Sequence, residues 1–285
     1  MKAQLIDGKQ ISAEIKAEAA EEAAALKAKG ITPCLAVVLV GDDSASQVYV
    51  NNKKKACEAV GIRSVSHVLS GGTTEEALLE LIAKLNADKD IHGILVQMPV
   101  PKQIDERKVI LAIDPKKDVD CFHPVNVGNL HTGGEGFLPC TPAGIIELIK
   151  RSGHSIEGKQ CVVIGRSNIV GKPVAMLLMQ ENGTVTICHS KTKNLAEICR
   201  GADIIVSAVG KVNTVTADMV KEGAILIDVG MNRNEAGKLC GDVDFENVKE
   251  IAGAITPVPG GVGPMTIAML MKNCNTAAKI QNGLK

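Results

Sequence analysis

Residues 161–179 read CVVIGRSNIVGKPVAMLLM, and this stretch decides the fold. The apolar residues before Gly165 predict a buried strand, and the apolar run after Gly171 predicts a helix. A strand, a glycine turn and a helix in this order direct backbone N–H groups at an anion, which suits a pyrophosphate. The stretch is not GxGxxG. It is also not a P-loop, because its glycines lie one residue too far apart and Pro173 replaces the magnesium-binding hydroxyl. A tight turn without a ligand therefore stays open at this point.

The next predicted strand, residues 184–189, favours NADP over NAD as the dinucleotide. Folds that bind NAD place an acidic residue about 20 residues after the glycine turn, on the ribose hydroxyl. Here the strand is followed by Ser190 and Lys191, without a carboxylate, while Arg166 and Ser167 stand in the glycine turn itself. Cations and hydroxyls at positions where an acid would repel a phosphate indicate NADP. We expect Lys191 itself to lie on the solvated surface.

Outward from this stretch, apolar strand-like runs alternate with helical patterns, which predicts an α/β fold with parallel sheets. Further strands are expected at 35–41, 62–69, 91–97, 203–210 and 224–230, with a last apolar segment near 251–256. A helix is expected within 1–30, and another is expected to run through Tyr49 and Lys53 to Gly61. A third helix is expected to open on Thr73, with Glu76 completing a capping box. Thr141 followed by Pro142 predicts the N-cap and first turn of another.

A segment rich in glycine, proline, histidine and asparagine, residues 114–141, separates the two halves. A loop of this length inside a compact protein is usually functional or a linker. The simplest partition gives two α/β domains with parallel sheets. We expect a first domain at 1–145, joined by a C-terminal helix of about 266–285, and a Rossmann-type domain at 146–265.

The composition excludes several classes of protein. The 285 residues carry 32 basic and 32 acidic side chains, so nothing indicates binding to nucleic acid or to an anionic membrane. The longest apolar runs are too short to span a bilayer, and the first 30 residues lack the apolar core of a signal peptide. Nine cysteines without CxxC pairs predict reduced thiols and no metal site. We therefore expect a cytoplasmic protein.

Tyr49 is the single tyrosine of a chain without tryptophan, and it stands four residues before Lys53. Residues four apart are neighbours on a helix, so one of these side chains can hold a substrate over the other. The pair by itself is ambiguous between a buried ring beside a solvated lysine, a short-chain dehydrogenase dyad and a substrate platform. Short-chain dehydrogenases place the nucleotide turn first and the pair far downstream. The order here is reversed, which excludes them.

Three more segments fall at expected loops or strand ends, where open parallel sheets form their sites. They contain Gln97 in VQMPVP, Asp120 in KDVDC and the glycines of PGGVGP, residues 259–264. Asp120 could be an ordinary turn residue. The glycines permit either a turn with positive φ or close approach to a ligand.

The motifs VGDxxASxxYxxxK, VQxPxP, KDVD, PCTPxG, GRSxIVGxP, CHSKT and TPVPGGVGPMT occur in this order over nearly the whole chain. Together they resemble the bifunctional methylenetetrahydrofolate dehydrogenase/methenyltetrahydrofolate cyclohydrolase family. The resemblance implies oxidation of 5,10-methylenetetrahydrofolate with NADP, then hydrolysis to 10-formyltetrahydrofolate, within one-carbon metabolism that serves purine biosynthesis. It also implies a folate cleft between the two domains and a homodimer.

The resemblance assigns roles to individual residues. Lys53 would be the principal catalytic group of the cyclohydrolase, assisted by Gln97. Tyr49 would stack against the folate, and Asp120 would hydrogen-bond the pterin. The implied folate-binding residues are Ser46, Tyr49, Lys53, Val96, Gln97, Met98, Asp120, Pro259, Gly260, Gly261, Val262 and Gly263. The implied NADP-binding residues are Gly165, Arg166, Ser167, Ser190 and Met231.

The chain departs from the family pattern at Cys121, where glycine normally follows KDVD. If this position needs positive φ, cysteine is strained there and the role of Asp120 is put in doubt. The thiol could be reactive or buried and inert, and we expect the second. A competing class is a non-enzymatic NADP-binding regulator. It explains residues 161–230 but leaves Tyr49, Lys53, Gln97 and PGGVGP without a purpose.

Overall fold

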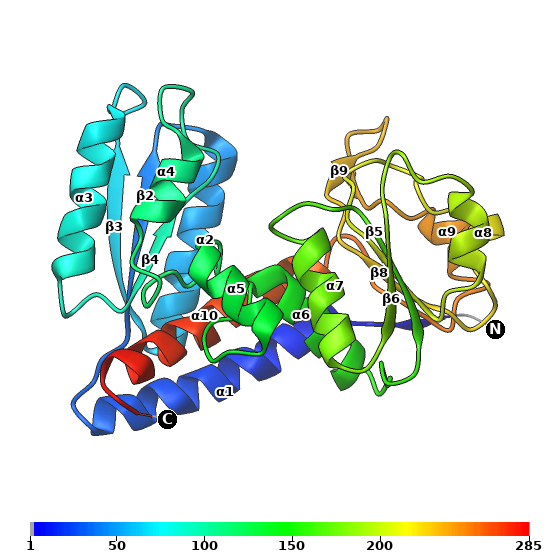
Figure 1. Cartoon of the computed structure of the whole chain (residues 1–285), viewed down its shortest axis with the longest axis horizontal. Helices are drawn as coiled ribbons and strands as arrows, with labels where there is room; N and C mark the ends of the chain where they lie inside the picture. Colours follow the sequence, from blue (N-terminus) through cyan, green and yellow to red (C-terminus); the bar gives the residue numbers. More distant parts are fainter. Residues whose placement is uncertain (1–2, 285) are drawn as a thin grey trace. The chain divides into compact units, whose positions relative to one another are not determined.

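The computed structural model describes residues 3–284, and by contact these form two compact units (Figure 1). The first unit comprises the described residues up to Ala13 together with Thr141–Thr266. The second comprises Glu14–Cys140 together with the described residues from Ile267 onward. Two long helices, α1 (Gly8–Ala28) and α10 (Val262–Gln281), contribute residues to both units. No helix within residues 3–284 is both long and apolar enough to cross a membrane.

The first unit is built on a parallel sheet with the strand order β1-β11-β8-β7-β5-β6. Its strands are β1 (Gln4–Leu5), β5 (Gln160–Ile164), β6 (Thr184–Cys188), β7 (Ile204–Ser207), β8 (Ile225–Asp228) and β11 (Ala254–Ile255). Its further elements are α6 (Cys140–Arg151), α7 (Gly171–Gln180), α8 (Leu195–Arg200), η1 (Ala217–Met219), α9 (Phe245–Val248) and the antiparallel pair β9 (Asn232–Arg233) and β10 (Leu239–Cys240). The chain runs from β5 outward to β6 and then back across to β7. This reversal makes the unit a Rossmann-type fold.

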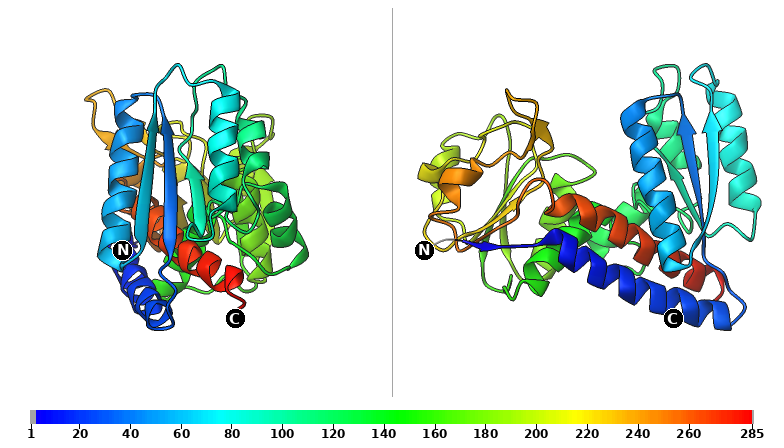
Figure 2. Two further views of the ribbon diagram at one scale, coloured as in Figure 1. Left: turned by 90° about the vertical axis from the view of Figure 1, so that its left-hand side faces the viewer. Right: turned by 180° about the vertical axis from the view of Figure 1, so that it is seen from behind.

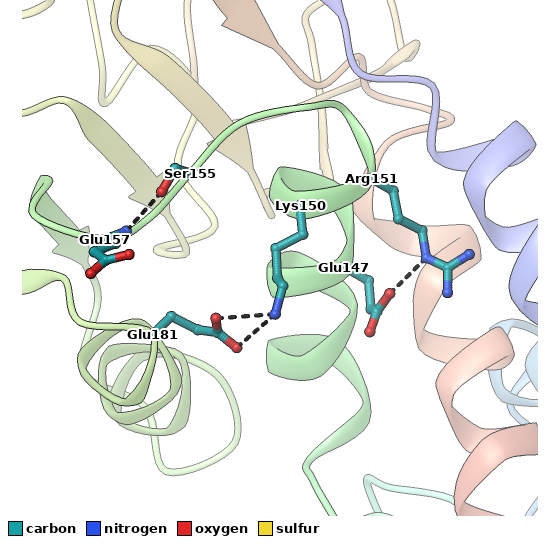
Figure 3. Close-up of polar contacts among 6 residues, drawn as sticks. All are labelled: Glu147, Lys150, Arg151, Ser155, Glu157 and Glu181. Atoms are coloured by element: carbon teal, nitrogen blue, oxygen red, sulfur yellow. Dashed lines mark hydrogen bonds and ion pairs between the residues drawn. The ribbon is translucent and has the colours of Figure 1, made fainter.

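Helices cover both faces of this sheet, because its central strands are apolar on both sides. Val162 and Ile164 point into a core that also holds Cys199 of α8, Leu226 of β8 and Val248 of α9. The helix α7 packs on the strands β5 and β6. A surface ion pair links α6 to the end of α7: Lys150 donates to both carboxylate oxygens of Glu181, at 3.0 and 3.1 Å (Figure 3).

The second unit contains a smaller parallel sheet with the order β3-β2-β4. Its elements are β2 (Cys34–Val40), α2 (Ser44–Val60), β3 (Arg63–Leu69), α3 (Glu75–Ala87), β4 (Gly93–Val96), α4 (Glu106–Ala112) and α5 (Pro124–Thr132). The helix α2 lies on one face of the sheet and α3 on the other (Figure 2). Every residue of β2 is buried, as expected of a central strand covered on both faces.

The structure corrects two expected helix starts. The N-cap of α3 is Thr74, whose side chain accepts from the Ala77 N–H, because Thr73 closes the preceding turn with Ser70. The helix α6 begins at Cys140, so Thr141 is not its N-cap and instead hydrogen-bonds Thr266 at 2.8 Å. Pro142 still fits, because the first N–H groups of a helix have no partner within it.

The first residues of the chain depart from the expected partition. The sequence pattern suggested a helix within 1–30 as part of the first domain, and the short strand β1 was not expected. Gln4 and Leu5 pair with β11. Gly8 packs closely against Gly261, because a Cβ added to Gly8 would lie 1.9 Å from the Gly261 carbonyl oxygen. These contacts explain why the described residues up to Ala13 belong to the first unit.

Candidate active site

Lys53 and Gln97 meet at the carboxyl edge of the small sheet. The helix α2 starts soon after β2, with the side chain of Asp43 accepting from the Ser46 N–H at 2.7 Å. Further along this helix, Lys53 is buried, with 9% of its surface exposed. Its Nζ donates to Gln97 Oε1 at 2.9 Å. An ammonium has three donors, so it can serve a substrate or a water molecule as well as Gln97.

The amide of Gln97 is fixed by its own neighbours. Its backbone N–H donates to the Val38 carbonyl at 2.8 Å, and its Nε2 donates to the Met98 carbonyl at 2.7 Å. These bonds turn Oε1 toward Lys53. The strands β3 and β4 lie on opposite sides of β2, so the strand order reverses between β2 and β4. Gln97 directly follows β4 at this reversal. Ligands of open α/β sheets bind at such points.

Asp120 belongs to the same locality as Lys53. Burial raises the pKa of the Asp120 carboxyl, the positive charge of Lys53 lowers it, and the negative charge of Asp118 raises it. Asp118 itself has a structural part, because it accepts hydrogen bonds from the N–H groups of Phe122 and His123 and from Asn126 Nδ2. The two aspartates of KDVD thus differ: one organises the loop, and the other stands near the lysine.

Cys121 adopts the conformation that puts a non-glycine residue under strain, with φ +61°. Its thiol is buried and donates to the Phe137 carbonyl at 3.2 Å. Burial, together with the charges of Asp118 and Asp120, raises the pKa of Cys121 to about 12. The thiol is therefore protonated at neutral pH, in agreement with the expectation of an inert group.

The remaining expected folate residues of the second unit differ in exposure. Tyr49 is 41% exposed, which excludes the alternative of a ring buried in the core. Ser46 and Val96 are buried, and Met98 is half-buried. The exposed lysines that follow Lys53, Lys54 and Lys55, form a solvated helix face, as expected.

In the first unit, the glycine turn folds back on itself at the carboxyl end of β5. Gly165 has φ +123°, and a Cβ there would lie 2.4 Å from the Ala208 carbonyl oxygen. A Cβ on Gly171 would lie 2.3 Å from the Gly165 carbonyl oxygen. A side chain at either position would collide with the backbone of the turn. Because both residues are glycines, the backbone of the turn can be approached closely by a ligand. Arg166 and Ser167 are exposed on this turn.

Ser190 comes to the same edge, two residues after β6. The strands β5 and β6 are adjacent, and the Gly165 N–H donates to the Cys188 carbonyl at 2.9 Å. Ser190 is exposed, as is Lys191. The carboxyl ends of the two strands thus present a guanidinium and hydroxyls in one region, the donors that a phosphorylated ribose requires.

The glycine-rich segment 259–263 lines a cavity of about 350 Å³ within the first unit. Gly260 has φ +106°, so the segment contains a turn with positive φ, and it also borders an open space. Met231 lies on the same cavity and is 58% exposed. The structure therefore brings Met231 together with 259–263, whereas Lys53 and Gln97 belong to the other unit.

Comparison with known proteins identifies the family. Residues 6–120 match the model "Tetrahydrofolate dehydrogenase/cyclohydrolase, catalytic domain", and residues 139–282 match the model "Tetrahydrofolate dehydrogenase/cyclohydrolase, NAD(P)-binding domain". The bifunctional protein FolD of Acetivibrio thermocellus is 60% identical over the full length of both chains. The FolD structure from Campylobacter jejuni has 53% identity and a TM-score of 0.95, and the match covers 98% of this chain and 99% of that one.

The chain belongs to the tetrahydrofolate dehydrogenase/cyclohydrolase family. It is accordingly a bifunctional enzyme of folate one-carbon metabolism, an oxidoreductase and a hydrolase, that uses NADP. The FolD structure from Trypanosoma brucei, a complex with NADP cofactor and inhibitor, has 42% identity, a TM-score of 0.92 and 98% coverage of both chains. The open turn at Gly165 and Gly171 fits a dinucleotide, and the alternative of a non-enzymatic regulator finds no support.

Sequence reasoning missed a pair of buried carboxylates in the enzyme's first unit. Asp228, at the end of β8, accepts from the N–H groups of Gly230, Asp242 and Val243. Asp242 accepts from the N–H groups of residues 209–211, from Ser207 Oγ and from Asn232 Nδ2. Glycine is required beside both, since a Cβ on Gly241 would lie 1.8 Å from Asp228 Oδ2. The pairing of DVG at 228–230 with GDVD at 241–244 was the available signal.

Proposed function

We propose that Lys53, Gln97, Tyr49 and Asp120 perform the folate chemistry of this enzyme, with Lys53 as the catalytic group of the hydrolysis. The observation that carries the proposal is the part-buried 2.9 Å hydrogen bond from Lys53 Nζ to Gln97 Oε1 at a reversal of strand order. A lysine in this position is held in place by a neutral acceptor. Gln97 thus orients the amine without neutralising its charge.

The two reactions make different demands on these residues. Loss of hydride from the methylene carbon leaves an amidinium that is stabilised by resonance, so the dehydrogenase step needs positioning more than a general base. NADP, when bound, accepts that hydride. In the hydrolysis, a water oxygen bonds to the methenyl carbon, the bond from that carbon to one ring nitrogen breaks, and this nitrogen gains a proton while a second proton is released. Lys53 relays these protons.

Substrate positioning falls to the groups around Lys53. The half-exposed ring of Tyr49 offers a face for stacking one turn before the lysine. Asp120 hydrogen-bonds the pterin. Its pKa is raised because the carboxyl is shielded from water, as a group that binds a substrate in a partly desolvated site would be. Ser46, Val96 and Met98 complete this group, and Pro259, Gly260, Gly261, Val262 and Gly263 contribute from the first unit. The folate cleft between the domains stays a prediction.

NADP is held by the first unit, in our proposal by Gly165, Arg166, Ser167 and Ser190, with Met231 near the nicotinamide. The support is that β5 and β6 are adjacent parallel strands, so their carboxyl ends lie together. The exposed side chains of Arg166, Ser167 and Ser190 follow these ends, beside the glycine turn. The exposed Met231 on the 350 Å³ cavity provides an apolar surface for a planar ring.

We further propose a homodimer in the cytoplasm. The strand β3 is an edge strand of seven residues, and edge strands pair readily with another chain. Val68 on this strand is 68% exposed, and the buried Nε2 of His67 has no hydrogen-bond partner among the described residues. The nine cysteines are all free, which suits a reducing compartment.

The catalytic assignment is tested with Lys53→Ala, assayed for methenyltetrahydrofolate hydrolysis and for NADP reduction. General acid–base groups contribute roughly 10²- to 10⁴-fold, so hydrolysis should fall by about that factor and dehydrogenation by much less. The matched control is Lys54→Ala, which removes an exposed lysine from the same helix and should leave both rates unchanged. Equal retention of both activities in Lys53→Ala would refute the assignment.

A further inference from the structure

Asn273 of α10 joins two loops behind the proposed folate site. It is 6% exposed, and its Nδ2 donates to the carbonyl of Val119 and to the carbonyl of Leu138, each at 2.8 Å. Both amide hydrogens are thus used. Val119 directly precedes Asp120, and Leu138 lies two residues before Cys140. One side chain from the C-terminal helix therefore fixes the backbone next to Asp120 and the backbone that leads to Cys140.

Cys140 adds a contact to the carboxylate itself. The thiol is buried, with Sγ 3.5 Å from the Val119 carbonyl oxygen and 3.9 Å from Asp120 Oδ1, and Asn273 Nδ2 lies 3.5 Å from it. Burial raises the pKa of Cys140, and the charge of Asp120 raises it further, against a smaller opposite effect of Lys53. The sulfur therefore keeps its proton and can donate a weak hydrogen bond toward the carboxylate.

The backbone strain at Cys121 explains why the contacts of Asn273 and Cys140 matter in this chain. A cysteine with φ +61° next to Asp120 favours relaxation to negative φ, which would rotate the preceding residue away. The bond from Asn273 to Val119 holds the backbone against this relaxation. Glycine at 121 would carry no such strain.

We propose that Asn273 and Cys140 are positioning residues for Asp120, Asn273 through the backbone of Val119 and Cys140 through the carboxylate. The proposal rests on the assignment of Asp120 to folate binding. Neither residue touches the substrate in this account. Their loss should weaken folate binding in both reactions and leave the binding of NADP unchanged.

The same helix provides a matched control. Asn275 is fully buried, and its Nδ2 donates to the Ala19 carbonyl at 2.8 Å, away from the loop at 117–121. Asn275→Ala therefore deletes the same buried amide from the same helix, and it removes one hydrogen bond to a backbone carbonyl where Asn273→Ala removes two. It separates a local effect on Asp120 from general damage to α10.

The experiment measures Tm and KM in wild type, Asn273→Ala and Asn275→Ala. The folate KM is that of methylenetetrahydrofolate in the dehydrogenase reaction and of methenyltetrahydrofolate in the hydrolysis, and the NADP KM is measured in the dehydrogenase reaction. Both variants should lower Tm. Asn273→Ala should raise the folate KM at least about tenfold in both reactions, with the NADP KM within twofold of wild type, and Asn275→Ala should change neither KM. Adding Cys121→Gly to Asn273→Ala should recover part of the folate KM. Equal folate KM values in the two asparagine variants would overturn the proposal.

Three further variants extend the test, and the two at Cys140 apply even if Asn273→Ala fails to fold. Cys140→Ala should raise the folate KM, and Cys140→Ser, which restores a donor, should recover it; no change in Cys140→Ala would overturn the proposal for the thiol. Asp120→Asn tests the underlying assignment separately. An unchanged folate KM in Asp120→Asn would refute the role of Asp120 itself, whereas a raised KM there with none in Asn273→Ala would refute the positioning role alone.

Discussion

At the scale of single residues, Arg166 offers the most specific test of how the enzyme prefers its dinucleotide. The guanidinium is exposed on the glycine turn, and Ser190 follows the adjacent strand. Hydrogen bonds to charged groups are worth about 1.5–3 kcal/mol, so Arg166→Ala should lower the NADP to NAD ratio of kcat/KM by roughly 10- to 100-fold. Lys191→Ala should leave the ratio unchanged as a control. An unaltered ratio in Arg166→Ala would make the assignment wrong.

Asp228 predicts a dependence of stability on pH. Burial raises its pKa from 3.8 to about 6; the N–H groups of Asp242, Val243 and Gly230 oppose this, and the charge of Asp242 adds to it. Because the folded pKa is the higher one, the folded state binds the proton more tightly. The resulting stabilisation is complete below pH 3.8 and is lost as the pH rises through about 6.

Urea unfolding of wild type and Asp228→Asn at pH 5 and pH 8 checks this sign. The asparagine cannot titrate, so subtracting its free energy of unfolding removes the contributions of other groups, including Lys9 on the same cavity. The wild-type value minus the variant value should fall by about 1 kcal/mol between the two pH values. A difference that stays constant, or that grows with pH, would show that Asp228 is not the titrating group.

At the scale of elements, the sequence was most informative where periodicity and glycine spacing acted together. The strand, turn and helix at 161–179 are where they were expected, because an apolar run and two glycines constrain the backbone independently of its neighbours. Boundaries were less predictable. Thr73 and Thr74 are equally good caps by residue type, and the turn closed by Ser70 decided between them.

The elements that escaped prediction depend on contacts distant in sequence. The two residues of β1 are too few for a periodic pattern, and they form a strand because β11 offers a parallel edge. The residues Asp228 and Asp242 look like turn aspartates until the hairpin β9–β10 folds over the end of β8. By contrast, Lys53 and Gln97, 44 residues apart, were paired by the family resemblance, and a hydrogen bond joins them in the structure. Gln97 directly follows β4, whereas Lys53 lies within the helix that follows the adjacent strand β2.

At the scale of the whole molecule, the proposed homodimer should depend on β3. Val68→Lys places a charge on the exposed edge strand of each copy, and like charges facing one another oppose pairing. We expect light scattering to give about twice 29.9 kDa for the wild type and 29.9 kDa for the variant. Leu111→Lys, a comparable change at an exposed site on α4, should remain dimeric. A wild type of single-chain mass would contradict the dimer.

The central claim is that one chain separates two reactions: positioning suffices for hydride loss, whereas hydrolysis requires Lys53. The most direct test supplies Lys53→Ala with methylenetetrahydrofolate and NADP and follows methenyltetrahydrofolate and NADPH together by absorbance. The account predicts that the methenyl compound accumulates in step with NADPH on the time scale of NADP reduction. Formation of 10-formyltetrahydrofolate in the wild-type proportion would contradict it.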